Sequence, residues 1–518
     1  MFIKPTEEQE AILKAVKEYE RVKVYAKAGC GKTTTLKLIA KDNPDKKILY
    51  LAFNKAIADE ARGSFPENVE VRTIHSLAYV HVGKKYKNRL SSSFDIFEIC
   101  DKFNVEFEFV VLFLRIFNSW LHTDITFKED KRLTNFIKKI DVNGYVFNLD
   151  EVKEMKGFLK EFWNEIKKVC SNIKITHDVY LKLFELNFNR YKCKDKYNIV
   201  FLDEANDTND VTLSIFNRFN EKKIMVGDKY QKIYGFRGSI NGMEKFKADK
   251  VLHLTYTFRF DDEEKVRLVN DYLQYCQGER KEYLIKPFGR KDDDNRIETE
   301  CYLCRTNAKV LEMLEVEDLK TVRHPDNFFK NIYLLLKRKY KIGFKEDVRF
   351  LSGNDYYEKV KEVAEVIGDM DVYSSANLIL RVIRMGFNPY QYFDELKDKA
   401  ISLYFSNLKR FVGTAHSCKG LEFDRVVVCD DFPTIEELIE DLYKSGRLHG
   451  VPETPVLKLS KSMLTNIFKQ GSNKVKEELN LLYVVLTRFK KEIELPEIYY
   501  LKDEYAVELY KENKMKIK

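Results

Sequence analysis

Short apolar runs alternate with amphipathic segments in the first part of the chain. The run RVKVY at 21–25 and the run KKILYLAF at 46–53 predict β-strands, and each is followed by a segment with helical spacing. Strands and helices that alternate in this order are typical of a parallel α/β sheet. We therefore predict a doubly wound α/β domain in this part of the chain.

The pattern changes between residues 82 and 190, where amphipathic segments are rich in Phe, Tyr, Lys and Glu and lack the alternating strand signal. We predict a helical insertion there. The strand pattern resumes with YNIVFLDE at 197–204 and KKIMVGD at 222–228, two apolar runs that end in acidic residues. The acidic ends of these two strands are expected to line a site.

A second α/β region is predicted from about residue 251, with further strands at 299–306, 347–353, 411–417 and 425–431. The pattern between residues 353 and 409 is mostly helical. The predicted fold class is therefore α/β, with two parallel sheets that each carry a mainly helical insertion. The predicted boundaries are a first domain at 1–81 and 191–250, its insertion at 82–190, a second domain at 251–353 and 409–518, and a small insertion at 354–408.

Composition narrows the class of protein. With 518 residues, 44% of them hydrophobic and 33% charged, the chain is expected to form several ordered domains. A net charge of +8 suits a polyanionic partner, although it is diluted over a long chain. The nine cysteines are scattered, and the apolar stretch around 107–117 is shorter than the roughly 20 residues that cross a bilayer. We expect a soluble monomer of a reducing compartment without membrane partners.

The segment AKAGCGKTT lies at a predicted turn from strand to helix and has the features of a phosphate-binding loop. Glycines let backbone N–H groups surround phosphates, and the helix N-terminus adds partial positive charge. A lysine at this position reaches the β- and γ-phosphates, and the following threonine can ligate Mg²⁺. The predicted ATP-binding residues here are Ala26, Lys27, Ala28, Gly29, Cys30, Gly31, Lys32, Thr33 and Thr34.

A phosphate-binding loop needs carboxylates for the metal ion and for the attacking water. The segment FLDEAND at 201–207 supplies two at the end of an apolar strand. We predict that Asp203 holds Mg²⁺ together with Thr33, and that Glu204 activates water for hydrolysis.

The order of motifs resembles the UvrD/Rep branch of superfamily 1 helicases, and especially the helicase part of F-box DNA helicases. The similar segments are PTEEQEAI, LAFNKAIADEA, VRTIHSLAY, FLDEANDTN, VGDKYQKIYGFRGS, LTYTFRF, GTAHSCKGLEFDRVVV and EELNLLYVVLTRFKK, which together span residues 5–491. The chain departs from the family pattern at Ala26, where glycine is usual, and at Asn206, where glutamine is usual. The resemblance implies two RecA-like domains with ATP at their interface.

The resemblance also implies residue roles. Gln9 would read adenine, Phe258 would stack under it, and Gln231 would sense the γ-phosphate. Arg259 and the arginine finger Arg488 would reach the γ-phosphate from the second domain, so that hydrolysis depends on closure. Glu422 would belong to the ATP site. The DNA contacts implied by the motifs are Phe53, Asn54, Thr73, His75, Phe236, Arg237, Thr414 and His416.

We therefore expect an ATP- and Mg²⁺-dependent helicase that moves 3′ to 5′ on single-stranded DNA and acts at single/double-strand junctions, in repair, recombination or replication. Three alternatives stay open. They are a DNA-stimulated ATPase that displaces proteins without processive unwinding, a module in which ATP is a switch, and a motor that acts on RNA. The low glutamine content with abundant Lys and Glu favours a prokaryotic or viral origin and the cytoplasm, with the nucleus expected for a eukaryotic protein.

Two further patterns are expected to be structural. Cys301 and Cys304 form a CxxC without a second pair of matching spacing, so a metal site is not expected. The basic stretch at 336–341 is expected to be a solvated helix face. We also expect no nuclease domain after Arg488 and no F-box ahead of the motor.

Overall fold

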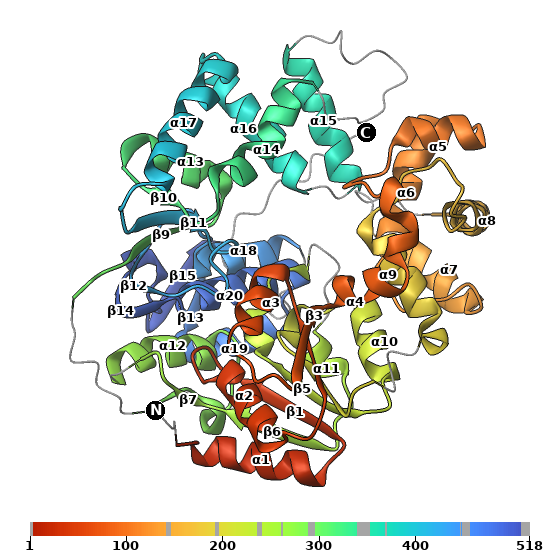
Figure 1. The fold of residues 1–518 in the computed structure, drawn as a ribbon. Coiled ribbons are helices and arrows are strands. Elements are labelled where there is room, and N and C mark those ends of the chain that lie inside the picture. Colours follow the sequence, from red (N-terminus) through yellow and green to blue (C-terminus); the bar gives the residue numbers. More distant parts are fainter. Residues whose placement is uncertain are drawn as a thin grey trace.

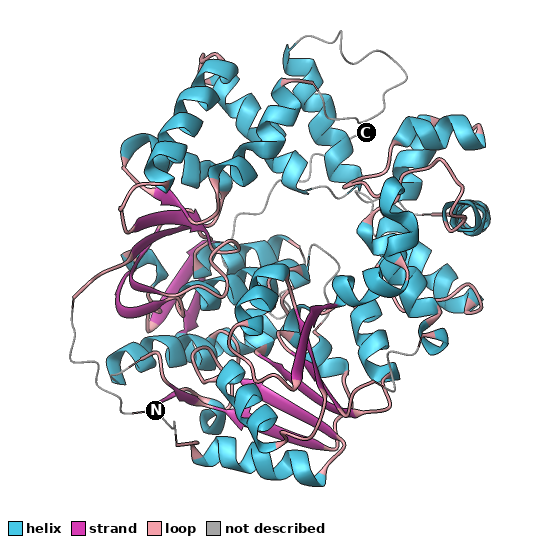
Figure 2. Ribbon diagram, viewed as in Figure 1, coloured by secondary structure: helices cyan, strands magenta, loops and turns pink. Residues whose placement is uncertain are grey.

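The computed structural model describes residues 4–140, 147–191, 196–235, 241–260, 263–288, 296–338, 353–367, 370–445, 447 and 456–508. Two separate parallel sheets with surrounding helices dominate these residues (Figure 2). The predicted α/β class with parallel sheets is confirmed. Among the helices of the described ranges, none combines the length and the apolar character that a bilayer crossing requires.

The first sheet has six strands in the order β3-β2-β4-β5-β1-β6, and every neighbouring pair is parallel. Side chains alternate along each strand, so Tyr50 faces one side while Leu49 and Leu51 face the other. The strands are β1 (Arg21–Ala26), β2 (Ile48–Ala52), β3 (Val69–Thr73), β4 (Ile199–Leu202), β5 (Lys222–Gly227) and β6 (Lys250–Leu254).

Helices cover both faces of the first sheet. On one face lie α1 (Glu7–Glu18), α2 (Lys32–Asp42) and α3 (Lys55–Arg62), whose apolar residues share a core with the Tyr50 side of the sheet. On the other face lie α4 (Ile74–His81), α9 (His177–Leu186) and α10 (Asp210–Arg218), and the short α11 (Gly242–Lys245) follows β5. Thr6 starts α1 through a capping box with Gln9.

The first insertion is helical, and it follows α4 in the chain. It contains η1 (Gly83–Arg89), α5 (Ile96–Phe103), α6 (Phe107–Leu121), α7 (Asp130–Lys139) and α8 (Leu149–Ile166), and the chain then returns through α9 and η2 (Phe188–Arg190) to β4. Aromatic side chains at helical spacing form its interior, including the fully buried Phe113, Phe117, Trp120 and Phe162. The insertion is therefore a packed unit with a core that continues into the first domain.

The second sheet has five parallel strands in the order β10-β11-β9-β12-β14. They are β9 (Glu300–Cys304), β10 (Lys320–Thr321), β11 (Arg410–Thr414), β12 (Phe423–Val428) and β14 (Phe489–Glu494). The accompanying helices are α12 (Glu263–Tyr275), α13 (Asn307–Val316), α18 (Ile435–Lys444), α19 (Leu464–Lys469) and α20 (Asn473–Val485). Two small sheets complete the domain, the pair β7 (Tyr256–Thr257) with β8 (Lys286–Pro287) and the pair β13 (Val456–Ser460) with β15 (Glu504–Glu508).

The second insertion differs from its predicted extent. Its helices are α14 (Pro325–Leu336), α15 (Gly353–Ile367), α16 (Met370–Arg384) and α17 (Pro389–Tyr404), so helical structure begins before the predicted start at 354. The strand predicted at 347–353 lies outside the described residues except for Gly353, which begins α15. The boundary predicted at 250/251 falls inside β6, because this edge strand has mostly exposed and half-buried side chains and a weak apolar signal.

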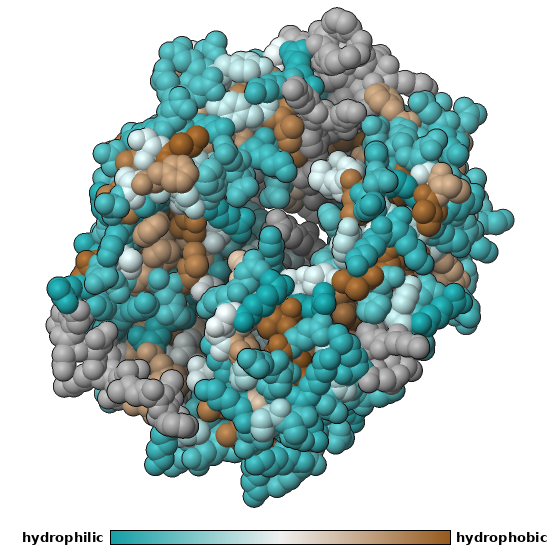
Figure 3. Space-filling model, in the orientation of Figure 1, coloured by the Kyte–Doolittle hydropathy of each residue, from teal (hydrophilic) through white to brown (hydrophobic). Residues whose placement is uncertain are grey.

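In Figure 1 the second insertion lies at the top and the first insertion at the right, and the two come together at α15 and α6. Helix α15 of the second insertion packs against α6 of the first, and apolar residues of both helices share one core. The face shown in Figure 3 is mostly hydrophilic, carries small hydrophobic groups and is hollowed near its centre. The chain thus encloses a central region with both sheet domains and both insertions around it.

Candidate functional site

The segment predicted to bind phosphate, residues 26–34, forms the turn from β1 to α2. We name it the phosphate loop. Gly29 and Gly31 have φ angles of 71° and 75°, which favour glycine. A Cβ atom at Gly29 would lie 2.7 Å from both Arg259 Cβ and Thr257 Oγ1, and the backbone N–H of Phe258 donates to the Gly29 carbonyl at 2.9 Å. The loop is therefore in direct contact with the segment that leads into the second domain.

Lys32 begins α2 and forms an ion pair with Glu204, the residue directly after Asp203 at the end of β4. Burial by itself would raise the pKa of Glu204, but the ammonium groups of Lys32 and Lys419 lower it to about 2. Glu204 also has a left-handed backbone, with φ of 49°, a conformation that costs about 1–3 kcal/mol in a residue with a side chain. The turn holds an ionised carboxylate beside the phosphate loop.

Asp203 lies against the same loop and is 4% exposed. Its Oδ2 accepts a hydrogen bond from the Tyr50 hydroxyl at 2.6 Å, and its Oδ1 accepts one from the Glu204 N–H at 2.9 Å. Burial and the neighbouring Glu204 raise the pKa of Asp203. A Mg²⁺ ion at a phosphate loop takes most of its ligands from phosphates and water, so one carboxylate and the exposed Thr33 hydroxyl fit such an ion.

Two arginines complete a charged cluster with Lys32, Glu204 and Glu422. Arg259 contacts the Glu422 carboxylate and the Thr487 carbonyl, while its Nε is buried without a hydrogen-bond partner. Arg488 is 2% exposed and donates to the carbonyls of Val484 and Leu421. Burial and then the neighbouring Arg259 lower the pKa of Arg488 to about 10. Glu204 Oε2 is also buried without a hydrogen-bond partner, so donors and acceptors suited to a phosphate and a water meet here.

The residues predicted to contact adenine lie beside the loop. Gln9 is 1% exposed, closes the capping box of α1 and donates through Nε2 to Thr35 Oγ1 at 3.1 Å. A Cβ atom at Gly31 would lie 3.1 Å from Phe258 Cε2 and 3.3 Å from Gln9 Nε2. The Phe258 ring is 36% exposed and is therefore accessible for stacking.

A hydrogen-bond chain links the loop with a second-domain helix. The Ala28 N–H donates to the Tyr483 hydroxyl at 3.3 Å, and this hydroxyl donates to Asp228 Oδ2 at 2.9 Å. Gln231 Nε2 donates to the same oxygen at 3.0 Å. Gln231, the predicted γ-phosphate sensor, and Tyr483 on α20 of the second domain therefore donate to the same carboxylate oxygen of Asp228.

Sequence reasoning assigned no role to Lys419, which joins the two domains at this point. Its ammonium contacts the buried Asp207 carboxylate and donates to the Gln231 carbonyl at 2.6 Å. Glu8 was also missed. It accepts hydrogen bonds from the backbone N–H groups of Thr255 and Tyr256, and so it links α1 to the segment that precedes Phe258. Both are charged residues inside matched motifs, and that position is the signal that could have identified them.

Near the predicted DNA contacts, aromatic rings from both domains form a row. Phe53 is 37% exposed, and its ring stacks on Tyr234 with centroids 5.5 Å apart. Tyr234 also lies 6.0 Å from the His416 ring and donates to the His416 carbonyl at 3.2 Å. We name Phe53, Tyr234 and His416 the aromatic row. Tyr234 was not predicted, and Phe236 and Arg237 lie outside the described residues.

The other predicted DNA contacts lie outside the aromatic row. The side chains of Asn54 and Thr73 cap α3 and α4, and Thr414 Oγ1 accepts from the Ser417 N–H at 3.2 Å. His75 is half-buried 3.7 Å from Asp178, and burial lowers its pKa. Thr414, His416 and Tyr234 line a cleft of about 580 Å³ that extends over the second sheet toward α14 and α16. We name it the interdomain cleft.

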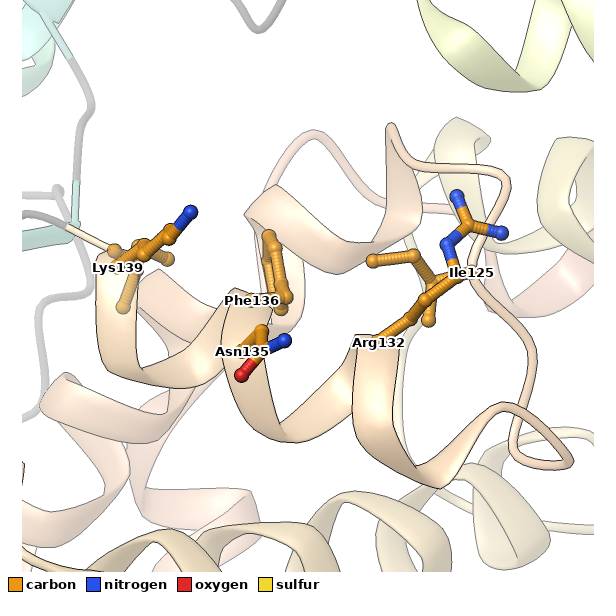
Figure 4. A pocket seen from close by; sticks show the side chains of 6 residues that line it. Ile125, Arg132, Asn135, Phe136 and Lys139 are labelled. Atoms are coloured by element: carbon orange, nitrogen blue, oxygen red, sulfur yellow. The ribbon is translucent and has the colours of Figure 1, made fainter.

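A separate pocket of about 340 Å³ lies on α7 of the first insertion (Figure 4). Arg132, Asn135, Phe136 and Lys139 line one side of that helix, and Arg132 is already paired with Asp124 and Glu129. This pocket contains none of the predicted site residues. Among the described residues no group of three or more His, Cys, Asp or Glu side chains is arranged to hold a metal ion. Cys301 and Cys304 on β9 are among the residues to which this applies.

Comparison with known proteins identifies the family of this chain. Residues 6–251 match the model of the UvrD/REP helicase N-terminal domain, and residues 140–497 match that of the UvrD-like helicase C-terminal domain. F-box DNA helicase 1 of Gallus gallus is 28% identical over 94% of this chain and 48% of its own length. F-box DNA helicase protein 1 of Schizosaccharomyces pombe is 25% identical over 94% of this chain and 57% of its own length.

The chain thus spans about half the length of the curated relatives it matches. A probable DNA helicase II homolog of Mycoplasma genitalium is 24% identical over 42% of this chain and 35% of its own length. The Pif1 helicase of Candida albicans is 13% identical over 61% of this chain and 54% of its own, with a TM-score of 0.27. The extent of the two matched models shows that this chain belongs to the UvrD-like family of DNA helicases, which confirms the enzyme family predicted from its sequence.

Proposed function

We propose that this chain is an ATP-driven motor that moves 3′ to 5′ along single-stranded DNA and separates duplexes. The observation that carries the proposal is the charged cluster, in which Lys32 and Glu204 of the first domain lie beside Arg488 of the second. An arginine finger can be worth about 10³ to 10⁵ in rate, and it acts only when the domains meet. Opening and closing of this interface would be the power stroke.

Each residue of the cluster has a role in this account. Lys32 and the loop N–H groups would bind the phosphates, Phe258 and Gln9 would hold the base, and Arg259 and Arg488 would stabilise charge on the γ-phosphate. Thr33 and Asp203 would hold Mg²⁺, which supplies charge neutralisation at the phosphates when it is bound. Glu204 is ionised and can accept a proton from water at Oε2, which has no hydrogen bond and lies 3.8 Å from Lys419 Nζ.

The aromatic row supports single-stranded DNA as the partner. Stacking on aromatic side chains binds every base, so it suits a motor that moves regardless of sequence. Phe53 and Tyr234 belong to the first domain and His416 to the second, so a change at the domain interface alters the spacing of the row. Thr414, His416 and the rest of the interdomain cleft would hold the single-stranded DNA between steps.

The direction and the biological setting come from the family resemblance. The names of the F-box relatives state that they are DNA helicases, which supports DNA over RNA. We propose that the protein works as a monomer at single/double-strand junctions in repair, recombination or replication. Two relatives are eukaryotic, so the prokaryotic or viral origin stays a prediction from composition.

Strand separation on tailed duplexes tests the proposal. With ATP and Mg²⁺, the protein should release the strand of a duplex with a 3′ single-stranded tail and leave a duplex with a 5′ tail intact. Release only from the 5′-tailed substrate would overturn the direction. ATP-dependent removal of a bound protein from single-stranded DNA, without strand release, would favour the displacement alternative.

A further inference from the structure

A further ion pair joins the phosphate loop to the second domain. The ammonium of Lys27 contacts Glu279 Oε2, in the segment that follows α12. Both side chains are 4% exposed, so the pair is almost removed from water. Lys27 also belongs to the loop through its backbone, because its N–H donates to the Leu254 carbonyl at 3.1 Å and its carbonyl accepts from Cys30 at 3.2 Å.

Both partners are held in place by other groups. The Lys27 ammonium lies 4.5 Å from the centre of the Tyr230 ring, and Lys229 Nζ lies 3.4 Å from Glu279 Oε1. The backbone N–H of Arg280 donates to the same oxygen at 3.1 Å. Burial by itself would raise the pKa of Glu279, but Lys27 and then Lys229 lower it. The carboxylate is therefore ionised and fully engaged, and the Lys27 ammonium is directed away from a role on phosphate.

Stability alone does not explain this pair. Burying an ion pair costs free energy because both charges lose their hydration. Apolar side chains of similar volume often stabilise a protein as well or better. The position of the pair offers another reason. Glu279 follows α12, whose Tyr272 hydroxyl donates to the Leu479 carbonyl of α20 at 3.1 Å. Helix α20 carries Tyr483 and leads directly to Arg488.

We propose that Lys27 and Glu279 couple the phosphate loop to the second domain, so that nucleotide binding at the loop repositions α12, α20 and Arg488. The inference deepens the proposed function and rests on it. Lys27 and Glu279 are positioning residues here, because neither would touch the reacting atoms. The path runs from the loop through the ion pair, α12 and α20 to Arg488, and it lies beside the hydrogen bond of Ala28 with Tyr483, which also joins the loop to α20.

The test uses the full chain with Lys27→Met, Glu279→Gln and the exchanged double variant Lys27→Glu with Glu279→Lys. The matched control is Lys461→Met. It removes an ion pair in which Lys461 Nζ lies 2.7 Å from Asp271 Oδ2 on the same helix α12, and it leaves the phosphate loop unchanged. Steady-state kcat and KM for ATP are measured with and without single-stranded DNA. Hydrogen exchange of residues 276–283 is followed with and without ADP.

Each single variant should lower kcat about tenfold, within the usual range of coupling between sites, and change KM for ATP by less than about threefold. The exchanged variant should recover most of the loss, and the control should match the wild type. ADP should protect residues 276–283 in the wild type and in the exchanged variant but in neither single variant. A single variant that fails to fold leaves the other single variant and the exchanged variant to decide.

Two results would overturn the coupling. One is retention of the ADP-dependent protection in Glu279→Gln, and the other is an equal loss of kcat in the exchanged and single variants. Failure of the proposed function looks different. In that case wild-type hydrolysis would not respond to DNA, while the ADP-dependent protection and its loss in the single variants would remain.

Discussion

The two places where the domains meet are built from different side chains. The charged cluster consists of ion pairs that are largely shielded from water. The side chains of Lys32 and Glu204 are each 15% exposed, and that of Arg259 is 7% exposed, although its partner Glu422 is 38% exposed. The aromatic row consists of rings, of which Phe53 is 37% exposed. A buried charge depends strongly on the exact place of its partner, whereas a stacking surface tolerates any base. In the proposed function, the charged cluster would control ATP hydrolysis and the aromatic row would bind the single strand.

Loss of a cluster residue should have the largest effect. Lys32→Ala and Arg488→Ala should each reduce steady-state ATP turnover by about 10³ or more, because phosphate binding or transition-state charge stabilisation is lost. Lys41→Ala on the same helix α2, where the side chain is exposed, is the matched control and should keep full turnover. Wild-type turnover in either cluster variant would show that the ATP site is assigned wrongly.

Lys419→Met tests whether the buried charges depend on their partners. It leaves the Asp207 carboxylate buried beside Glu204 without its ammonium partner. The free energy of unfolding, measured with denaturant, should fall by roughly 3 kcal/mol. Adding Asp207→Asn removes the unpaired charge and should recover part of that loss. An unchanged unfolding midpoint in Lys419→Met would contradict the account of the cluster.

The aromatic row should respond to loss of a ring rather than of a charge. Tyr234→Ala should weaken binding of single-stranded DNA by about 1–3 kcal/mol, the range expected for one stacked base. Tyr234→Phe keeps the ring and should bind almost as well as the wild type in a fluorescence titration. Equal loss in both variants would point to the hydrogen bond with His416 and away from stacking.

The smallest effect should come from the titration of His75. Its pKa is lowered by burial, so the ring is neutral at pH 7 and gains charge only as the pH falls below the usual value of about 6.5. Affinity for single-stranded DNA should therefore change less than about twofold between pH 8 and 7, and it should rise below about pH 6.5. His75→Asn should remove that rise. A rise already between pH 8 and 7 that this variant abolishes would contradict the direction of the shift.

The alternation of strands and helices along the chain could be predicted because its signals are local, and the residues proposed for the ATP site were chosen from equally local motifs. Apolar runs that end in glycine or acids mark β1 and β4, and the residues around Lys32 and Glu204 lie within short motifs. The edge strand β6, the two-residue β10 and the start of α14 were missed because short or partly exposed elements have weak periodicity.

Contacts between distant segments explain the site residues that were not predicted. Lys419 meets Asp207 across 212 positions, and Tyr234 meets His416 across 182. Nothing in the local pattern shows which charged or aromatic residue of a motif will face the other domain. The pair of Lys27 with Glu279 is of the same kind, because one partner belongs to a motif and the other does not.

Steady-state ATP hydrolysis with and without single-stranded DNA tests the central claim most directly, with single-stranded RNA and several salt concentrations as comparisons. The account predicts strong stimulation by DNA, little by RNA, and a stimulation that weakens with salt because phosphate contacts release counterions. Unchanged hydrolysis in the presence of DNA, by a protein that still binds ATP, would contradict the motor and favour a nucleotide switch.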